Sequence, residues 1–244
     1  MEPTLIWILV SVLGGFVLAL LLGRGLVPAL RALKAGQSIR EVGPKWHQGK
    51  AGTPTMGGIV FILSSLLCIV TGWHAMRETG DYKHLLVLAL ALMFGLIGFA
   101  DDFIKVKKKR NLGLTGLQKL VLQVLAACLF LAGMHFTNAL TYDLYIPFVR
   151  EPLVHIPPLV YLALSVFIIV GCVNAVNLTD GIDGLATGVT LPVMLFFTLV
   201  SMTAKQWGLA TFPATLVGAL GGFLFYNFYP AKTFMGDTGS LYLG

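Results

Sequence analysis

Aspartates gather in three short segments of this sequence, each at the end of an apolar run. Asp101 and Asp102 directly follow LLVLALALMFGLIGFA, so two adjacent carboxylates stand at the boundary of an apolar segment. Their mutual repulsion and partial desolvation raise the free energy of ionising both. A bound divalent cation, or a lysine such as Lys105, would relieve that repulsion, whereas a plain solvated helix end is the alternative explanation.

The second segment, NAVNLTDGIDGLA at 174–186, contains no basic residue. Asn174, Asn177, Asp180 and Asp183 place four amide or carboxylate groups within ten residues, and a glycine follows each aspartate. Such a turn can direct oxygens at a cation while backbone N–H groups face an anion. The spacing differs from an EF-hand loop, which needs more oxygen ligands and a terminal glutamate. Turn formation without function is the competing interpretation.

The third segment reads FMGDTGSL at 234–241 and has glycines on both sides of Asp237. These glycines permit close approach of the backbone to a ligand, and Thr238 or Ser240 can cap a following helix. A helix start opened by a glycine-rich turn is a natural seat for a phosphate. Capping alone explains the hydroxyls but not the GDTG pattern.

A fourth segment, KAGTPTMGG at 50–58, offers Lys50 and hydroxyls such as that of Thr55 at another helix start, although a plain Gly/Pro turn fits it equally well. Together the four segments supply carboxylates for a cation, lysines for phosphate and small residues for close approach. This equipment indicates phosphoryl transfer, in which positioning and electrostatic stabilisation carry most of the catalysis. Mg²⁺ suits an all-oxygen donor set, whereas zinc would favour cysteine or histidine.

The elements that must position these residues are transmembrane helices. Hydrophobic residues make up 57% of the chain and charged residues 11%, with a mean hydropathy of +0.84, far from the roughly 25% charged content of soluble domains. Continuous apolar runs without period-2 alternation exclude a barrel and predict an all-α, polytopic bundle. The seven predicted spans are approximately residues 4–23, 57–73, 85–100, 120–136, 159–173, 185–204 and 206–229. The last residues, from Ser240, resemble the start of an eighth span.

Positive charge predicts the orientation of these spans. Connections on one side of the membrane carry thirteen lysines and arginines and those on the other carry four, which places the N-terminus outside. All four polar segments then lie on the cytoplasmic face. Because the basic residues flank apolar runs and form no stripe with aromatics, nucleic acid is not an expected partner.

The four polar segments, of which the Asp101–Asp102 pair is one, resemble the phospho-N-acetylmuramoyl-pentapeptide-transferase family over essentially the whole chain. This family belongs to the polyprenyl-phosphate N-acetylhexosamine-1-phosphate transferases, and the PTMGG and NLTDG sequences favour the muramoyl branch. The resemblance implies a Mg²⁺-dependent enzyme of the bacterial inner membrane. Undecaprenyl phosphate would attack UDP-N-acetylmuramoyl-pentapeptide, releasing UMP and forming the first lipid intermediate of peptidoglycan. A homodimer would fit the family.

Matching positions imply that Asp237 is a magnesium ligand, and that Asp101 acts as base or positions the lipid phosphate, with Asp102 beside it as a third catalytic residue. Phe234 would stack on uracil. The substrate cleft implied by the resemblance comprises Lys50, Thr55, Lys105, Lys119, Asn174, Asn177, Asp180, Asp183, Asn227 and Phe234.

The family's pattern also includes about ten spans and a histidine-rich inner loop near its C-terminus, neither of which this sequence contains. We therefore expect residues 1–244 to be a single transferase domain without its C-terminal spans, and inactive if this is the whole protein. One alternative is an N-acetylglucosamine-1-phosphate transferase of the same superfamily. A cation-coupled transporter is another, although the acids stand at the inner boundary rather than in mid-span.

Overall fold

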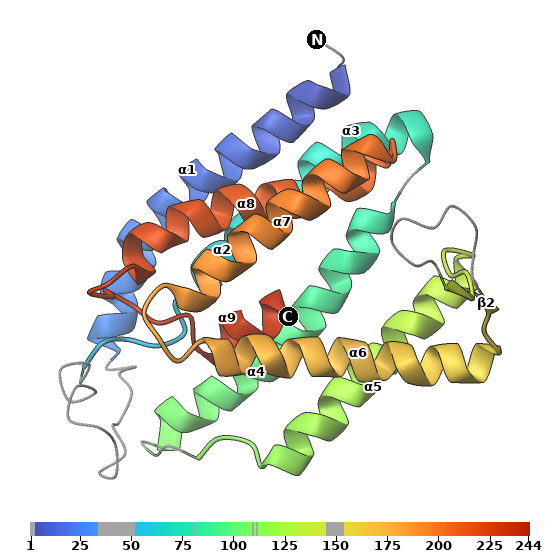
Figure 1. Cartoon of the computed structure of the whole chain (residues 1–244). Coiled ribbons are helices and arrows are strands. Elements are labelled where there is room, and N and C mark those ends of the chain that lie inside the picture. The colour runs from blue at the N-terminus through green and yellow to red at the C-terminus, as the bar shows by residue number, and fades with distance from the viewer. Residues whose placement is uncertain (1–2, 34–51, 81, 109, 111, 145–153) are drawn as a thin grey trace.

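The computed structural model describes residues 3–33, 52–80, 82–108, 110, 112–144 and 154–244. Its elements in chain order are α1 (Pro3–Ala32), α2 (Ile59–Ser65), α3 (Leu67–Thr79), α4 (Lys83–Lys108), α5 (Gly116–Phe136), β1 (Asp143–Leu144), β2 (Val154–His155), α6 (Pro158–Thr179), α7 (Leu185–Thr203), α8 (Trp207–Asn227) and α9 (Gly236–Leu243). The two short strands pair antiparallel, with Asp143 opposite His155. The fold is otherwise helical, as the sequence predicts (Figure 1).

Six of the described helices are long and apolar enough to cross a membrane: α1, α4, α5, α6, α7 and α8. Each coincides with a predicted span. The predicted segment at 57–73 instead forms two shorter helices, α2 and α3, which meet at Leu66. Two serines lie just before this interruption: Ser64 Oγ donates to the Val60 carbonyl at 2.8 Å and Ser65 Oγ to the Ile62 carbonyl at 2.7 Å. Hydroxyls that bond back to the preceding turn bend helices.

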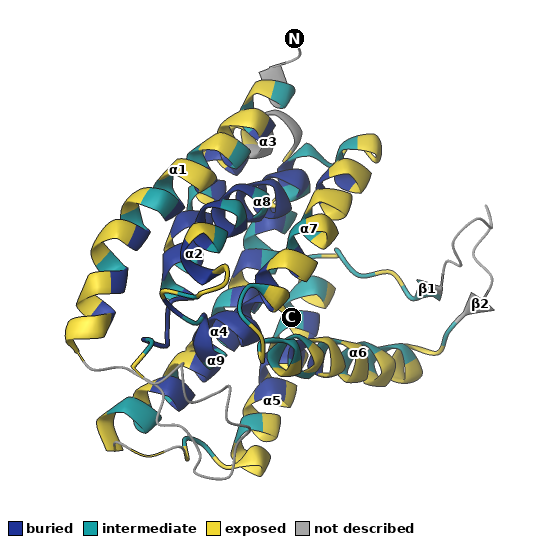
Figure 2. Ribbon diagram, turned by 60° about the vertical axis from the view of Figure 1, so that its left-hand side comes forward, coloured by how far each residue is buried: buried dark blue, intermediate teal, exposed yellow. Residues whose placement is uncertain are grey.

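Helix α8 occupies the interior of the bundle and contacts α1, α7, α2 and α3. Figure 2 shows α8 and α9 largely buried, whereas α1, α6 and α7 present exposed faces outward. Small residues bring α1 and α8 together: a methyl group on Gly218 would overlap the Val12 carbonyl, and one on Gly15 would lie 2.5 Å from the Thr215 carbonyl. Such close backbone approach is typical of membrane helices, whose association depends on packing.

Helix α9 contacts α2, α4 and α6 in the middle of the bundle. Its residues Thr238 to Leu243 are all buried. The short helix therefore lies where the ends of several longer helices meet, which makes it the element that positions the polar residues described next.

Candidate active site

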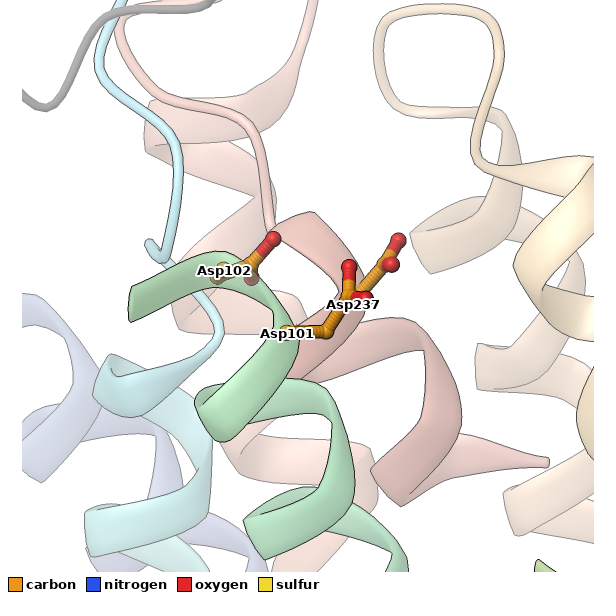
Figure 3. A group of neighbouring side chains, drawn as sticks. All are labelled: Asp101, Asp102 and Asp237. Atoms are coloured by element: carbon orange, nitrogen blue, oxygen red, sulfur yellow. The ribbon is translucent and has the colours of Figure 1, made fainter. Parts of the chain in front are cut away.

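The three predicted catalytic aspartates converge where α4 meets α9. Figure 3 shows Asp101 and Asp102 on consecutive positions of α4 and Asp237 at the start of α9. One oxygen of each carboxylate lies within 4.8 Å of the others. The approach depends on Gly98, one turn before Asp101, because any side chain there would overlap the backbone of Asp237. The sequence segments at 101–102 and 234–241 thus form one site.

Two lysines bridge these carboxylates. Lys105 Nζ lies 2.5 Å from Asp101 Oδ2, 3.0 Å from Asp237 Oδ2 and 3.7 Å from Asp102 Oδ1. Lys119 Nζ, from the first turns of α5, lies 2.7 Å from Asp237 Oδ2 and 3.6 Å from Asp101 Oδ2. With all five groups ionised, the cluster keeps an excess of one negative charge.

Asp101 and Asp102 differ in what holds them. Asp101 Oδ1 accepts a hydrogen bond from the Leu114 N–H at 2.8 Å, so the carboxylate fixes the connection before α5. Asp102 Oδ2 accepts two bonds from Thr238, from its N–H at 2.9 Å and from its hydroxyl at 2.7 Å. Because the first N–H groups of a helix have no partner within it, Asp102 caps α9 from a neighbouring helix.

Two ammonium groups, those of Lys105 and Lys119, lie against the Asp237 carboxylate and favour its ionised form. Its other oxygen accepts a hydrogen bond from Asn177 Nδ2 at 2.9 Å. A partly exposed carboxylate with these partners is suited to binding a cation.

Backbone hydrogen bonds join residues 54–58 to residues 233–235. The Gly57 N–H donates to the Phe234 carbonyl at 2.8 Å, the Gly58 N–H to the Met235 carbonyl at 3.0 Å and the Phe234 N–H to the Pro54 carbonyl at 2.9 Å. The PTMGG and FMGDTG sequences therefore form one paired structure.

Gly236, which follows this pairing, has a φ of 69°, a backbone conformation that favours glycine. Its missing side chain is needed for a second reason. A methyl group there would lie 2.5 Å from Asp102 Oδ2 and 2.6 Å from Thr55 Oγ1. The Thr55 hydroxyl is buried and has no hydrogen-bond partner among the described residues. A hydroxyl left free beside a carboxylate at such a turn is an oxygen available to a ligand.

The other predicted cleft residues of α6 and its following turn have defined partners. Asn174 Nδ2 donates to Gln123 Oε1 at 2.7 Å and to the Val170 carbonyl at 2.8 Å, and thereby links α6 to α5. Asp183 Oδ2 accepts a bond from the Ala231 N–H at 3.0 Å, which ties the α6–α7 turn to the α8–α9 connection. Asp180 ends α6 as its C-terminal cap.

Asn227 and Phe234 lie in or beside the α8–α9 connection. Asn227 is buried between the Thr187 hydroxyl, which donates to it at 2.7 Å, and the Thr233 carbonyl, to which its amide donates at 3.1 Å. Phe234 is half-buried and fixed by its backbone bonds to residues 54 and 57. Lys50 lies outside the described residues.

The sequence did not indicate three partners of these residues. These are the contacts of Gln123 with Asn174, of Leu114 with Asp101 and of Thr238 with Asp102. They depend on which helix faces meet, and no sequence motif indicates that. Ser240 was predicted only as a helix cap, yet its hydroxyl accepts a bond from Asn177 Nδ2 at 2.7 Å. The glycine at position 98 was the one available signal that another backbone approaches α4 beside the aspartates.

The residues present fit a divalent cation. The donors are oxygens, the cluster carries excess negative charge, and Thr55 adds a buried hydroxyl beside Asp102. Hard cations such as Mg²⁺ prefer this donor set and are commonly held by one or two carboxylates together with substrate phosphates.

Comparison with known proteins gives a consistent result. The sequence pattern of glycosyl transferase family 4 matches residues 84–244, and signature 1 of the phospho-N-acetylmuramoyl-pentapeptide-transferases matches residues 50–62. The phospho-N-acetylmuramoyl-pentapeptide-transferase of Carboxydothermus hydrogenoformans is 47% identical over 239 residues, covering 96% of this chain and 72% of that protein. The Bacillus subtilis and Clostridium acetobutylicum proteins of the same name are 46% and 45% identical; each alignment covers 97% of this chain, and 72% and 73% of those proteins respectively. The chain therefore belongs to glycosyl transferase family 4 and, within it, to the phospho-N-acetylmuramoyl-pentapeptide-transferases.

Proposed function

We propose that this protein transfers phospho-N-acetylmuramoyl-pentapeptide from its UDP-linked donor to undecaprenyl phosphate. An oxygen of the lipid phosphate attacks the phosphorus that carries the sugar, and the bond from that phosphorus to UMP breaks. The products are UMP and a lipid diphosphate that carries the muramoyl pentapeptide. The relatives' shared name supports this reaction.

The observation that carries the proposal is the meeting of Asp101, Asp102 and Asp237 with Lys105 and Lys119. Phosphoryl transfer brings negatively charged oxygens of the two substrates together. Metal cations and ammonium groups reduce the repulsion between these oxygens, whereas carboxylates alone would increase it. Each lysine here contacts more than one carboxylate, so it can exchange one of these partners for a phosphate oxygen and remain charge-paired.

Distinct roles follow for the three aspartates. Asp237 is the proposed magnesium ligand, because its side chain is the most exposed of the three, at 19% against 2% for Asp101 and 3% for Asp102. Asp101 positions the lipid phosphate and is the proposed base, through Oδ2, which faces the lysines. Asp102 holds the start of α9 and thereby the position of Asp237. A bound Mg²⁺ would stabilise negative charge on the transferring phosphoryl group.

The donor cleft is proposed to extend from this cluster toward the α6–α7 turn and the α8–α9 connection, with Phe234 stacking on uracil. Its proposed lining residues are Lys50, Thr55, Lys105, Lys119, Asn174, Asn177, Asp180, Asp183, Asn227 and Phe234. Asn177 is supported by its bond to Asp237. Asn174 acts in this scheme through Gln123, by fixing α6 against α5.

Residues 1–244 are proposed to act as one integral domain of the bacterial inner membrane, with a homodimer as the proposed assembly. The second crossing consists of α2 and α3 together, α9 begins an eighth, and the N-terminus is outside. The charge bias between connections supports this orientation. The ends of α1, α4, α6 and α8 that carry or approach the site then face the cytoplasm, where a nucleotide sugar is available.

The test measures UMP release by the protein in its full natural length, reconstituted in lipid with undecaprenyl phosphate, Mg²⁺ and UDP-N-acetylmuramoyl-pentapeptide. We expect turnover that requires all three. A matched pair of variants tests the site: Lys105→Met should lose at least about a hundredfold in turnover through lost transition-state stabilisation. Lys107→Met, an exposed lysine of the same helix, should retain it. Silence with this donor but turnover with UDP-N-acetylglucosamine would overturn the proposal.

A further inference from the structure

A basic pocket of about 560 Å³ opens beside the C-terminal half of α1, lined by residues outside the site described above. Arg24 and Arg31 contribute from α1, where seven residues, or two turns, place them on one face. Lys232 contributes from the α8–α9 connection. Among the described residues, none of these three cations takes part in an ion pair. The pocket therefore concentrates positive charge without protein counter-charges in the described part of the chain.

Tyr226 and Lys232 are held in the pocket by several contacts. Tyr226 forms its floor, packed on Gly23 so closely that a methyl group there would overlap the ring. The Tyr226 hydroxyl donates to the Leu20 carbonyl at 2.7 Å. The Lys232 N–H donates to the Tyr226 carbonyl at 2.8 Å, and its ammonium group lies 4.7 Å from the centre of the Phe225 ring. These contacts fix Tyr226 and one of the three cations before any ligand binds.

A second hollow, of about 510 Å³, shares Lys232 with the basic pocket. Its lining is mainly apolar and aromatic and includes Phe16, Phe225 and Phe228, of which the last two are about two-thirds exposed. Gly221 of α8 leaves the hollow open, because it has no side chain to fill the space beside Phe16. Cations therefore stand at one end of an apolar groove on the surface of spanning helices.

We propose that the basic pocket and the apolar groove together bind one anionic phospholipid. The phosphate would lie among Arg24, Arg31 and Lys232, since one guanidinium group can donate two parallel hydrogen bonds to two phosphate oxygens. An acyl chain would follow the groove past Gly221. Basic pockets between membrane helices on the cytoplasmic side recognise anionic headgroups in this way. The proposed membrane orientation is used only to assign the lipid to the inner leaflet. The lipid site itself does not depend on the proposed transfer reaction.

The test measures lipid retention by native mass spectrometry of the purified protein titrated with phosphatidylglycerol or phosphatidylcholine, with no donor present. Wild type should retain phosphatidylglycerol in preference. Arg24→Gln/Arg31→Gln should weaken that retention about 25-fold, from about fivefold for each charge removed. The matched control Arg77→Gln/Lys205→Gln removes the same charge from exposed residues at the opposite end of the bundle and should leave retention unchanged. An equal loss in the control would overturn the assignment, as would no loss in the Arg24/Arg31 variant.

A second variant separates a lipid from a soluble anion. Gly221→Leu adds an apolar side chain to the groove and leaves all three cations in the sequence, and its Cβ would lie 3.5 Å from the Phe16 ring, an ordinary contact. We expect it to reduce phosphatidylglycerol retention at least fivefold. Unchanged retention, or full displacement of the lipid by inorganic phosphate, would show a phosphate site without a lipid.

Wild type alone provides an independent measurement. Phosphatidylglycerol with a photoreactive group in its acyl chain should label residues 225–229 on irradiation. Equal labelling of the lipid-facing sides of α5 and α6 would refute a specific site.

Discussion

Replacing Gly98 by alanine tests whether close approach of α4 and α9 builds the site. The added methyl group would overlap the Asp237 carbonyl and lie 2.8 Å from the Thr238 nitrogen. Ordinary contact begins at 3.4 Å, so α9 must move by at least 0.6 Å at Thr238, and further at Asp237. Both neighbours are backbone atoms, which cannot rotate away as a side chain would.

Two measurable effects should follow from Gly98→Ala. Overpacking of this kind costs about 1–3 kcal/mol of folding free energy. The displacement needed at the Asp237 carbonyl, in the backbone of a proposed metal ligand, is larger still, and a misplacement of about 1 Å can reduce turnover roughly a hundredfold. Activity should therefore fall much more than stability.

The assay compares UMP release and thermal unfolding of wild type, Gly98→Ala and Gly133→Ala in the same lipid or detergent. Gly133 is a helical glycine of α5 at which a methyl group would meet nothing within 4 Å, so its variant should match wild type in both measurements. Wild-type turnover by Gly98→Ala would refute the packing argument. Complete unfolding would instead show that the contact is needed for the fold before it is needed for the chemistry.

Three further predictions concern single contacts of the site. Asp237→Asn should lower turnover, because it removes several kcal/mol of transition-state stabilisation, and should raise the Mg²⁺ concentration needed for half-maximal rate. Wild-type rates at low Mg²⁺ would refute the ligand role. Thr238→Val removes one of two donors to buried Asp102 and should cost about 1–3 kcal/mol of unfolding free energy, measured by denaturation, and no loss would contradict the capping role. In a double-mutant cycle, Asn174→Ala and Gln123→Ala should couple by about 0.6–2 kcal/mol in stability. Strictly additive effects would show that the two side chains act separately.

The membrane fold was largely predictable because long apolar runs have few other structures. Each predicted apolar segment is helical in the structure, including the one that is divided into α2 and α3 at Leu66. That division was not predicted, since a serine in an apolar run can also face a neighbouring helix without bending its own. The interior position of α8 was equally hidden, because α8 is less hydropathic than peripheral helices such as α6.

The candidate site was predictable in its members but not in its contacts. Asp101 and Asp237 were grouped because both stand at the same membrane boundary, and the structure places them together. What the sequence could not give is the relative placement of α4 and α9, on which the bonds from Lys105 and Thr238 depend. Such contacts join residues more than 130 positions apart and follow from packing rather than from spacing.

The pairing of residues 54–58 with 233–235 makes two distant loops thermodynamically dependent on each other. Shifting one without the other would break three backbone hydrogen bonds, worth about 1 kcal/mol each. A ligand that favours one position of the 54–58 segment therefore favours the corresponding position of Gly236 and Asp237. By reciprocity, occupancy of the aspartate cluster must strengthen or weaken binding at Thr55 by the same factor. If the 54–58 segment binds the nucleotide sugar and Asp237 the cation, as proposed, the two ligands should bind cooperatively, although these segments lie nearly 180 residues apart in the chain.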